Sequence, residues 1–95
     1  MAKYKLTPKA EEDLKDIWRH IAQENEPAAD RLLMRWFDKF ELAAENPKMG
    51  VARPEIASDV RLLFEGNYVT LYEPASYGIL VVAVVYGGRD AESWL

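Results

Sequence analysis

The sequence contains no cysteine and only one histidine, His20. Without cysteine the chain has no disulfide, no thiolate nucleophile and no cysteine-ligated zinc. A single histidine cannot build a multi-histidine metal centre, so we predict no metal site and no cofactor. His20 lies within an expected helix, where a solvated or packed imidazole is far more common than a catalytic one.

Long apolar runs are also missing. The longest, residues 79–86, is far too short to span a bilayer. Residues 8–15 are polar where a signal peptide would need an apolar core. We therefore expect a cytoplasmic protein without membrane contact.

The chain has no excess of positive charge. Twelve basic residues face sixteen acidic ones, and the net charge is −4, divided evenly between residues 1–47 and 48–95. Proteins that grip a phosphate backbone usually carry a basic patch, so direct nucleic-acid binding is disfavoured. With 95 residues, of which 49% are hydrophobic, the sequence is typical of one globular domain over residues 1–95.

Two amphipathic helices are expected in the first half. Thr7 and Pro8 mark the first helix start, because a hydroxyl caps free N–H groups and proline fits the first helical position. The apolar stripe of this helix runs to about Glu24, and Pro27 opens a second helix that ends at about residue 45 or 46. The few residues between them predict an antiparallel helical hairpin.

The second half predicts a sheet. After a loop over residues 47–58, three segments are rich in β-branched and aromatic residues: 60–65, 68–72 and 79–86. Residues 66–67 form a two-residue hairpin turn, and the short stretch 3–6 is expected to be an edge strand. The predicted fold is α+β, ordered β-α-α-β-β-β, with the helical hairpin packed on a mainly antiparallel four-stranded sheet.

The hairpin turn fixes a register in which Glu65 opposes Tyr68 and Arg61 opposes Tyr72. One face is then apolar, and we expect the helices to cover it; it carries Leu62, Phe64, Val69 and Leu71. The other face is mixed and is expected to stay partly open; it carries Arg61, Leu63, Glu65, Tyr68, Thr70 and Tyr72.

No residue pattern indicates catalysis. The sequence has neither a phosphate-binding glycine loop nor a serine–histidine arrangement with a clear orienting group. The C-terminal segment holds Arg89, Trp94 and Leu95, and its terminal Trp-Leu either packs on the core or anchors a partner.

Five segments, in order along nearly the whole chain, resemble the ParE toxins of type II toxin–antitoxin modules. They are LTPKAEEDLKDIWRHIAQEN, PAADRLL, ENPKMGVARPE, GNYVTLY and VVYGGRD. ParE toxins belong to a superfamily that also holds the RelE ribonucleases. The resemblance implies the β-α-α-β-β-β order that periodicity had predicted independently.

The superfamily offers two mechanisms. RelE-like members cut mRNA on the ribosome with cationic side chains and a C-terminal tyrosine, whereas ParE-like members poison DNA gyrase. The corresponding positions here hold Val60, Leu62, Val69 and Leu95, and Arg89 is the only one of the RelE-like functional residues that is present. Phosphodiester cleavage needs positive charge and a general acid or base. The resemblance therefore implies a non-enzymatic gyrase inhibitor; the alternatives are a RelE-like mRNA endoribonuclease and a non-toxic antitoxin-binding module.

Two positions depart from the ParE pattern, with Glu73 where arginine is common and Tyr86 where histidine is common. Both changes bear on whether gyrase remains the target. The residues expected to contact the target are Arg61, Tyr72, Arg89, Trp94 and Leu95.

The resemblance also implies a ParD-like antitoxin whose helical segment folds on binding into an apolar groove, giving a hetero-oligomer. The toxin's acidity is compatible with a segment that carries basic residues. The residues expected to contact the antitoxin are Met34, Leu42 and the outer sides of Trp18 and Trp36.

Overall fold

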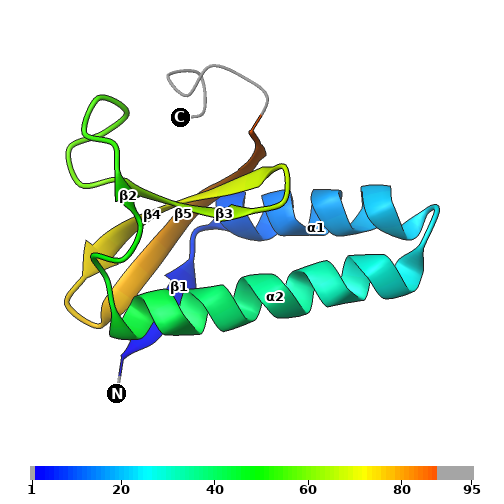
Figure 1. Ribbon diagram of the computed structural model, residues 1–95, viewed down its shortest axis with the longest axis horizontal. Helices are drawn as coiled ribbons and strands as arrows, with labels where there is room; N and C mark the ends of the chain where they lie inside the picture. Colours follow the sequence, from blue (N-terminus) through cyan, green and yellow to red (C-terminus); the bar gives the residue numbers. More distant parts are fainter. Residues whose placement is uncertain (1, 88–95) are drawn as a thin grey trace.

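Two helices lie side by side on one face of a sheet in the computed structural model, which describes residues 2–87 (Figure 1). The elements in chain order are β1 (Lys3–Leu6), α1 (Pro8–Ala22), α2 (Glu26–Glu45), β2 (Val51–Ala52), β3 (Arg61–Glu65), β4 (Tyr68–Ala75) and β5 (Gly78–Tyr86). The α+β class and the helical hairpin are as predicted.

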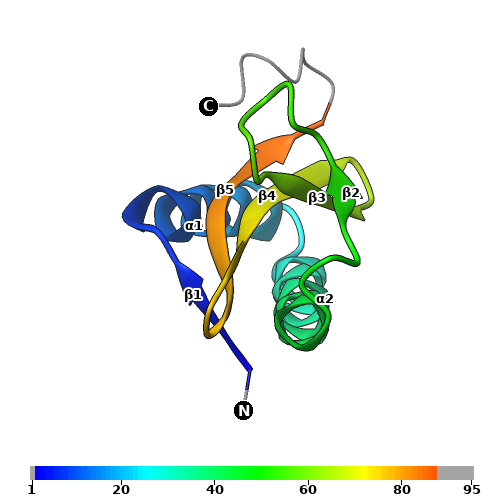
Figure 2. The same cartoon turned by 90° about the vertical axis from the view of Figure 1, so that its left-hand side faces the viewer.

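The sheet has five strands in the order β1-β5-β4-β3-β2, which Figure 2 shows from one end of the molecule. β1 is an edge strand, as predicted, and runs parallel to β5, while the other neighbours are antiparallel. The predicted count of four strands is wrong, because β2 forms inside the expected loop and pairs Val51 with Leu62. A strand of two residues has too little sequence to show a periodicity.

α1 is tied to β5 at its start. The Thr7 hydroxyl accepts a hydrogen bond from the Ala10 N–H (3.1 Å) and donates one to the Val82 carbonyl (2.8 Å). One turn later, the Asp13 carboxylate accepts a hydrogen bond from the Val84 N–H (3.0 Å). β1 ends at Leu6, so these side chains continue the hydrogen bonding of β5 where the edge strand stops.

The register of the β3–β4 hairpin is confirmed pair by pair, from Arg61 opposite Tyr72 to Glu65 opposite Tyr68. The prediction of which face the helices cover is wrong. They cover the mixed face, and their core includes Leu63 and Tyr72.

The other sheet face has a small core of its own. Ile56 and Ala57, from the segment before β3, pack on a cluster that contains three of the side chains expected under the helices, Leu62, Val69 and Leu71, together with Val60 and Ala83. Periodicity identifies two faces but not the element that covers each. The second cover here is a loop segment without any periodic signal.

A β-bulge in β5 lets this strand serve both cores. The β4–β5 register shifts between Leu71 and Tyr72, which pair with Ala83 and Val81 and leave Val82 as the extra residue. An extra residue reverses the alternation of side chains. Val81 and Val84 therefore both pack under the helices, whereas Ala83 faces the second core.

Candidate functional site: a groove along the helical hairpin

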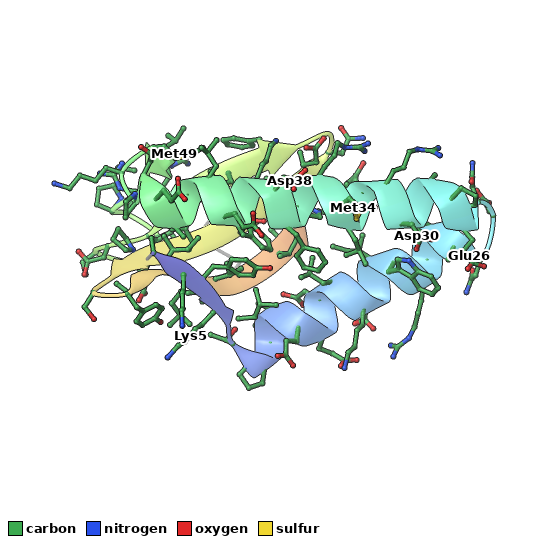
Figure 3. The ribbon with its side chains drawn as sticks, turned by 90° about the horizontal axis from the view of Figure 1, so that it is seen from below. Lys5, Glu26, Asp30, Met34, Asp38 and Met49 are labelled. Atoms are coloured by element: carbon green, nitrogen blue, oxygen red, sulfur yellow. The ribbon has the colours of Figure 1, made fainter. Side chains whose placement is uncertain are left out.

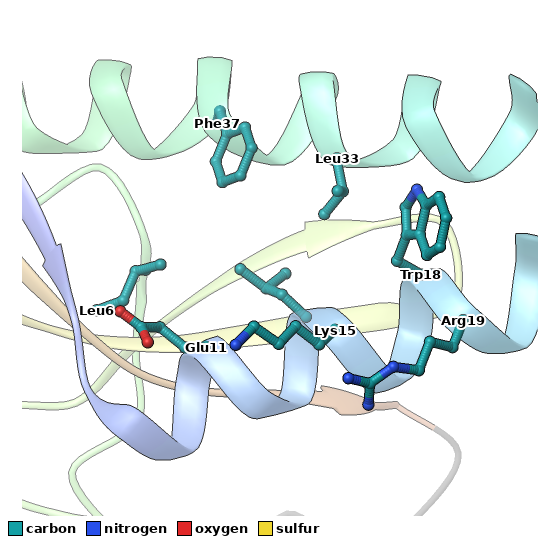
Figure 4. A pocket seen from close by; sticks show the side chains of 8 residues that line it. Leu6, Glu11, Lys15, Trp18, Arg19, Leu33 and Phe37 are labelled. Atoms are coloured by element: carbon teal, nitrogen blue, oxygen red, sulfur yellow. The ribbon is translucent and has the colours of Figure 1, made fainter. Parts of the chain in front are cut away.

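An apolar groove of about 480 Å³ runs between α1 and α2 (Figure 4). Its lining residues come from the end of β1 and from both helices: Leu6, Glu11, Leu14, Lys15, Trp18, Arg19, Leu33 and Phe37. Within each helix the apolar members are four residues apart, a spacing that places side chains on one face. The two helices thus turn matching apolar rows towards the same hollow.

A hydrogen bond joins the two helices at one end of the groove. The indole N–H of Trp18 donates to the Asp30 carboxylate at 2.8 Å. This bond fixes the half-buried Trp18 ring as part of the groove wall. The expectation that Trp18 offers an accessible side is consistent with this position.

Aromatic rings pack beside the other end of the groove. The Tyr4 ring lies 6.5 Å from that of Phe37 and 5.5 Å from that of Phe40, between ring centroids. Burial raises the pKa of Tyr4, and the nearby charge of Glu41 raises it further. The Tyr4 hydroxyl therefore stays neutral at physiological pH and adds no charge there.

The other predicted antitoxin contacts divide into two groups. Met34 and Leu42 are exposed, at 65% and 51% of their surface. Trp36 is fully buried and stacks near Phe40 with 5.7 Å between ring centroids. The expectation that Trp36 has an accessible outer side is therefore wrong, because its whole ring is needed to fill the core beneath α2.

Sequence reasoning missed Leu33 and Phe37 as surface-forming residues. Both belong to the apolar stripe of α2, which would ordinarily be buried, yet both are only half-buried and line the groove. The usable signal was the width of that stripe, since Leu33 and Phe37 extend it beyond the fully buried line through Trp36 and Phe40.

Arg61 and Tyr72, both predicted to contact the target, hold the loop before β2. The Arg61 guanidinium donates from Nη1 to the carbonyls of Lys48 (2.9 Å) and Gly50 (2.8 Å). The Tyr72 hydroxyl donates to the Pro47 carbonyl (2.7 Å) and accepts from the Gly50 N–H (2.9 Å). Burial raises the pKa of Tyr72, although the Gly50 amide and the Arg61 charge oppose this shift.

Tyr72 is fully buried, so the expectation that it lies on an open sheet face is wrong. Arg61 is half-buried. The remaining predicted target contacts, Arg89, Trp94 and Leu95, lie outside the described residues.

The family model for the ParE toxin of the type II toxin–antitoxin system, parDE, matches residues 4–91. The chain belongs to the ParE toxin family. A solved structure titled "Chromosomal ParDE TA system from P. aeruginosa" matches this ParE chain with a TM-score of 0.74 and 20% identity, covering 90% of this chain and 96% of that chain. At this identity the likeness concerns the fold. Comparison with curated proteins gives no significant match.

The positions that the superfamily resemblance matches to the cations of RelE-like nucleases are closed in this ParE fold. Val60, Leu62 and Val69 are 1%, 1% and 3% exposed and form part of the second core. Residues 2–87 contain no cluster of side chains that could hold a metal ion. Among the same residues, no helix has the length and apolar character needed to cross a membrane.

Proposed function

We propose that the protein is a non-enzymatic toxin that inhibits DNA gyrase, and that a ParD-like antitoxin neutralises it by occupying the groove between α1 and α2. The observation that carries the proposal is the ParE family match over residues 4–91. The closed sheet face and the open groove add physical support.

The closed sheet face argues against ribonuclease chemistry. Cleaving a phosphodiester requires cations around the scissile phosphate and a group that moves a proton. Aliphatic side chains fill that face at Val60, Leu62 and Val69, and Ile56 and Ala57 cover part of it. Arg61 is adjacent in sequence, but its Nη1 donates to two backbone carbonyls. The described residues thus favour inhibition by binding.

The groove is suited to a helical peptide. An amphipathic helix binds by laying one apolar row into a hollow between other elements. Here the hollow is about 480 Å³ and has apolar rows from both helices. A disordered antitoxin segment that folds as it binds would gain this apolar contact and lose its conformational freedom in the same step.

A gyrase titration tests the proposed target. Purified, folded protein is added to gyrase in supercoiling and DNA-cleavage assays, with the antitoxin as the reversing control. Loss of supercoiling together with accumulated cleaved DNA is the expected result. No effect at large molar excess contradicts the proposed target. Cleavage of mRNA on translating ribosomes would support the RelE-like alternative, and normal growth on toxin induction would support a non-toxic binding module.

A substitution in the groove tests the antitoxin site. Leu33→Glu places a charge among the apolar lining residues, and we expect antitoxin affinity to fall by about thirtyfold, the typical cost of losing a central contact. Phe64→Glu is the matched control, because Phe64 is 49% exposed and lies on the sheet face away from the helices. Equal affinities for the two variants, with circular dichroism unchanged, would contradict this site.

A further inference from the structure

One side of α2, next to the groove, carries a row of acidic residues. Glu26, Asp30, Met34 and Asp38 follow one another every fourth residue, and Figure 3 shows them along the exposed side of the helix. Glu41 and Glu45 extend the same side towards the C-terminal end of α2. We call this row the acidic ridge; its members are Glu26, Asp30, Met34, Asp38, Glu41 and Glu45.

The ridge carboxylates have no cationic partner within residues 2–87. Every ion pair there involves other acids. Of the three basic residues of α2, Arg35 and Lys39 pair with Glu65 at 3.1 Å and 3.0 Å, and Arg31, one turn before Met34, is in none of the ion pairs among residues 2–87. With five carboxylates and one arginine, this side of α2 keeps an excess of negative charge.

Apolar surface is exposed within and beside the ridge. Met34 is 65% exposed and sits between Asp30 and Asp38. Leu42 is 51% exposed and lines a shallow hollow of about 250 Å³ with Asp38, Glu41 and Glu45. Flexible methionine side chains adapt to the shape of a bound partner. This side of α2 thus offers apolar contact and uncompensated charge together.

The opposite wall of the groove, formed by α1, carries both acidic and basic residues. Arg19 pairs with Asp16 at 3.1 Å and with Glu12 at 3.6 Å, and Lys15 lines the groove beside Glu11. The α1 wall therefore mixes both signs, while the α2 side is mainly acidic, with five carboxylates and Arg31. A helix in the groove meets different charges on its two flanks.

We propose that the segment bound in this groove is a basic amphipathic helix. Its apolar row fills the groove and reaches Met34, and its lysine or arginine flank pairs with Asp30, Asp38 and Glu41. The ridge from Asp30 to Glu45 spans about 22 Å, the length of a helix of about 15 residues. An acidic helix would bring like charges against the ridge. The inference rests on the proposed function in taking the antitoxin as the source of this helix.

Two synthetic helical peptides of about 15 residues test the chemistry directly. They share one apolar row and carry either lysine or glutamate on the flank, and fluorescence anisotropy measures their affinity. Asp38→Lys/Glu41→Lys should weaken the lysine peptide about tenfold, since each exposed pair is worth a severalfold change and reversal adds repulsion. Asp59→Lys/Glu73→Lys changes the net charge equally, away from the groove, and should bind like wild type.

Three peptide results would overturn the inference. In the first, the ridge and control variants weaken binding of the lysine peptide equally, which indicates an effect of net charge alone. In the second, the wild type binds both peptides with equal affinity. In the third, it binds neither peptide. Circular dichroism of each variant establishes that the fold is kept.

The full-length antitoxin, bound to the same variants, separates this inference from the proposed function. Binding that the ridge variant weakens about tenfold more than the control supports both. Binding that is equal for the two variants overturns the ridge but leaves the antitoxin proposal in place. No binding to the wild type overturns the proposed partner, and the peptides then decide the chemistry of the surface alone.

Discussion

Tyr72→Phe removes one hydroxyl that serves two buried hydrogen bonds. Tyr72 is 0% exposed, and its hydroxyl is 2.7 Å from the Pro47 carbonyl and 2.9 Å from the Gly50 nitrogen. A buried hydrogen bond contributes about 1 kcal/mol net, and leaving its former partners unsatisfied raises the cost. We expect the free energy of unfolding to fall by about 2–3 kcal/mol. A domain of this size has roughly 5–14 kcal/mol in total.

Thermal unfolding, followed by circular dichroism, measures the loss. For a domain of this length about 4–8 °C is lost per kcal/mol, so the midpoint should drop by about 8–24 °C. Amide hydrogen exchange provides a local readout, because the Gly50 N–H loses its acceptor and should exchange faster. Tyr68→Phe is the matched control, since phenylalanine keeps the edge-to-face contact of ring 68 with Tyr86.

A midpoint within about 2 °C of wild type, with unchanged exchange at Gly50, would refute the reasoning. It would mean that the two hydrogen bonds of the Tyr72 hydroxyl do not stabilise the fold. The result also bears on the target. If the protein inhibits gyrase as proposed and Tyr72 acts only through the fold, the Phe variant should inhibit gyrase like the wild type at temperatures where it stays folded.

Two further predictions concern charge and backbone. Burial raises the pKa of Glu65, but hydrogen bonds and charges from Lys39 and Arg35 outweigh it, and the net pKa lies below the ordinary value. Glu65→Gln should therefore cost about 1 kcal/mol at pH 7, and in urea titrations this difference should vanish as the pH falls through the lowered folded-state pKa; a difference constant with pH would contradict the ion pairs. Gly78→Ala should destabilise far more than Gly66→Ala, because a Cβ at Gly78 (φ +142°) would lie 2.0 Å from a backbone oxygen, whereas Gly66 (φ +58°) has open space. Equal urea midpoints for the two alanine variants would contradict the close approach of β1.

Local chemistry explains what the sequence could predict. The cap at Thr7 and the two-residue turn at residues 66–67 act within a few residues, so the first helix start and the whole hairpin register follow from them. The exposure of Met34 and Leu42 follows similarly from their position off the apolar stripe.

Tertiary packing decides what the sequence could not predict. Tyr72 was expected on an open sheet face and Trp36 with an accessible outer side, yet packing between the helices and the sheet buries both completely. The cover over Leu62 comes from residues 56 and 57, which have no periodic pattern, and the bulge at Val82 depends on how β4 and β5 meet. The groove forms only where the two helices lie in contact, so the pattern of neither helix alone predicts it.

The parallel pairing of β1 with β5 constrains the order in which the chain folds. Lys3 pairs with Gly78, so β1 cannot join the sheet before β5, which comes far later in the sequence, has formed. The helical hairpin and the β3–β4 hairpin form from local contacts, whereas closing this long loop is slow. Until β5 is in place, Thr7 and Asp13 lack their hydrogen-bond partners at Val82 and Val84, and β1, whose Leu6 lines the groove, has no strand to pair with. A nascent chain thus completes its sheet and the groove between α1 and α2 in one late event.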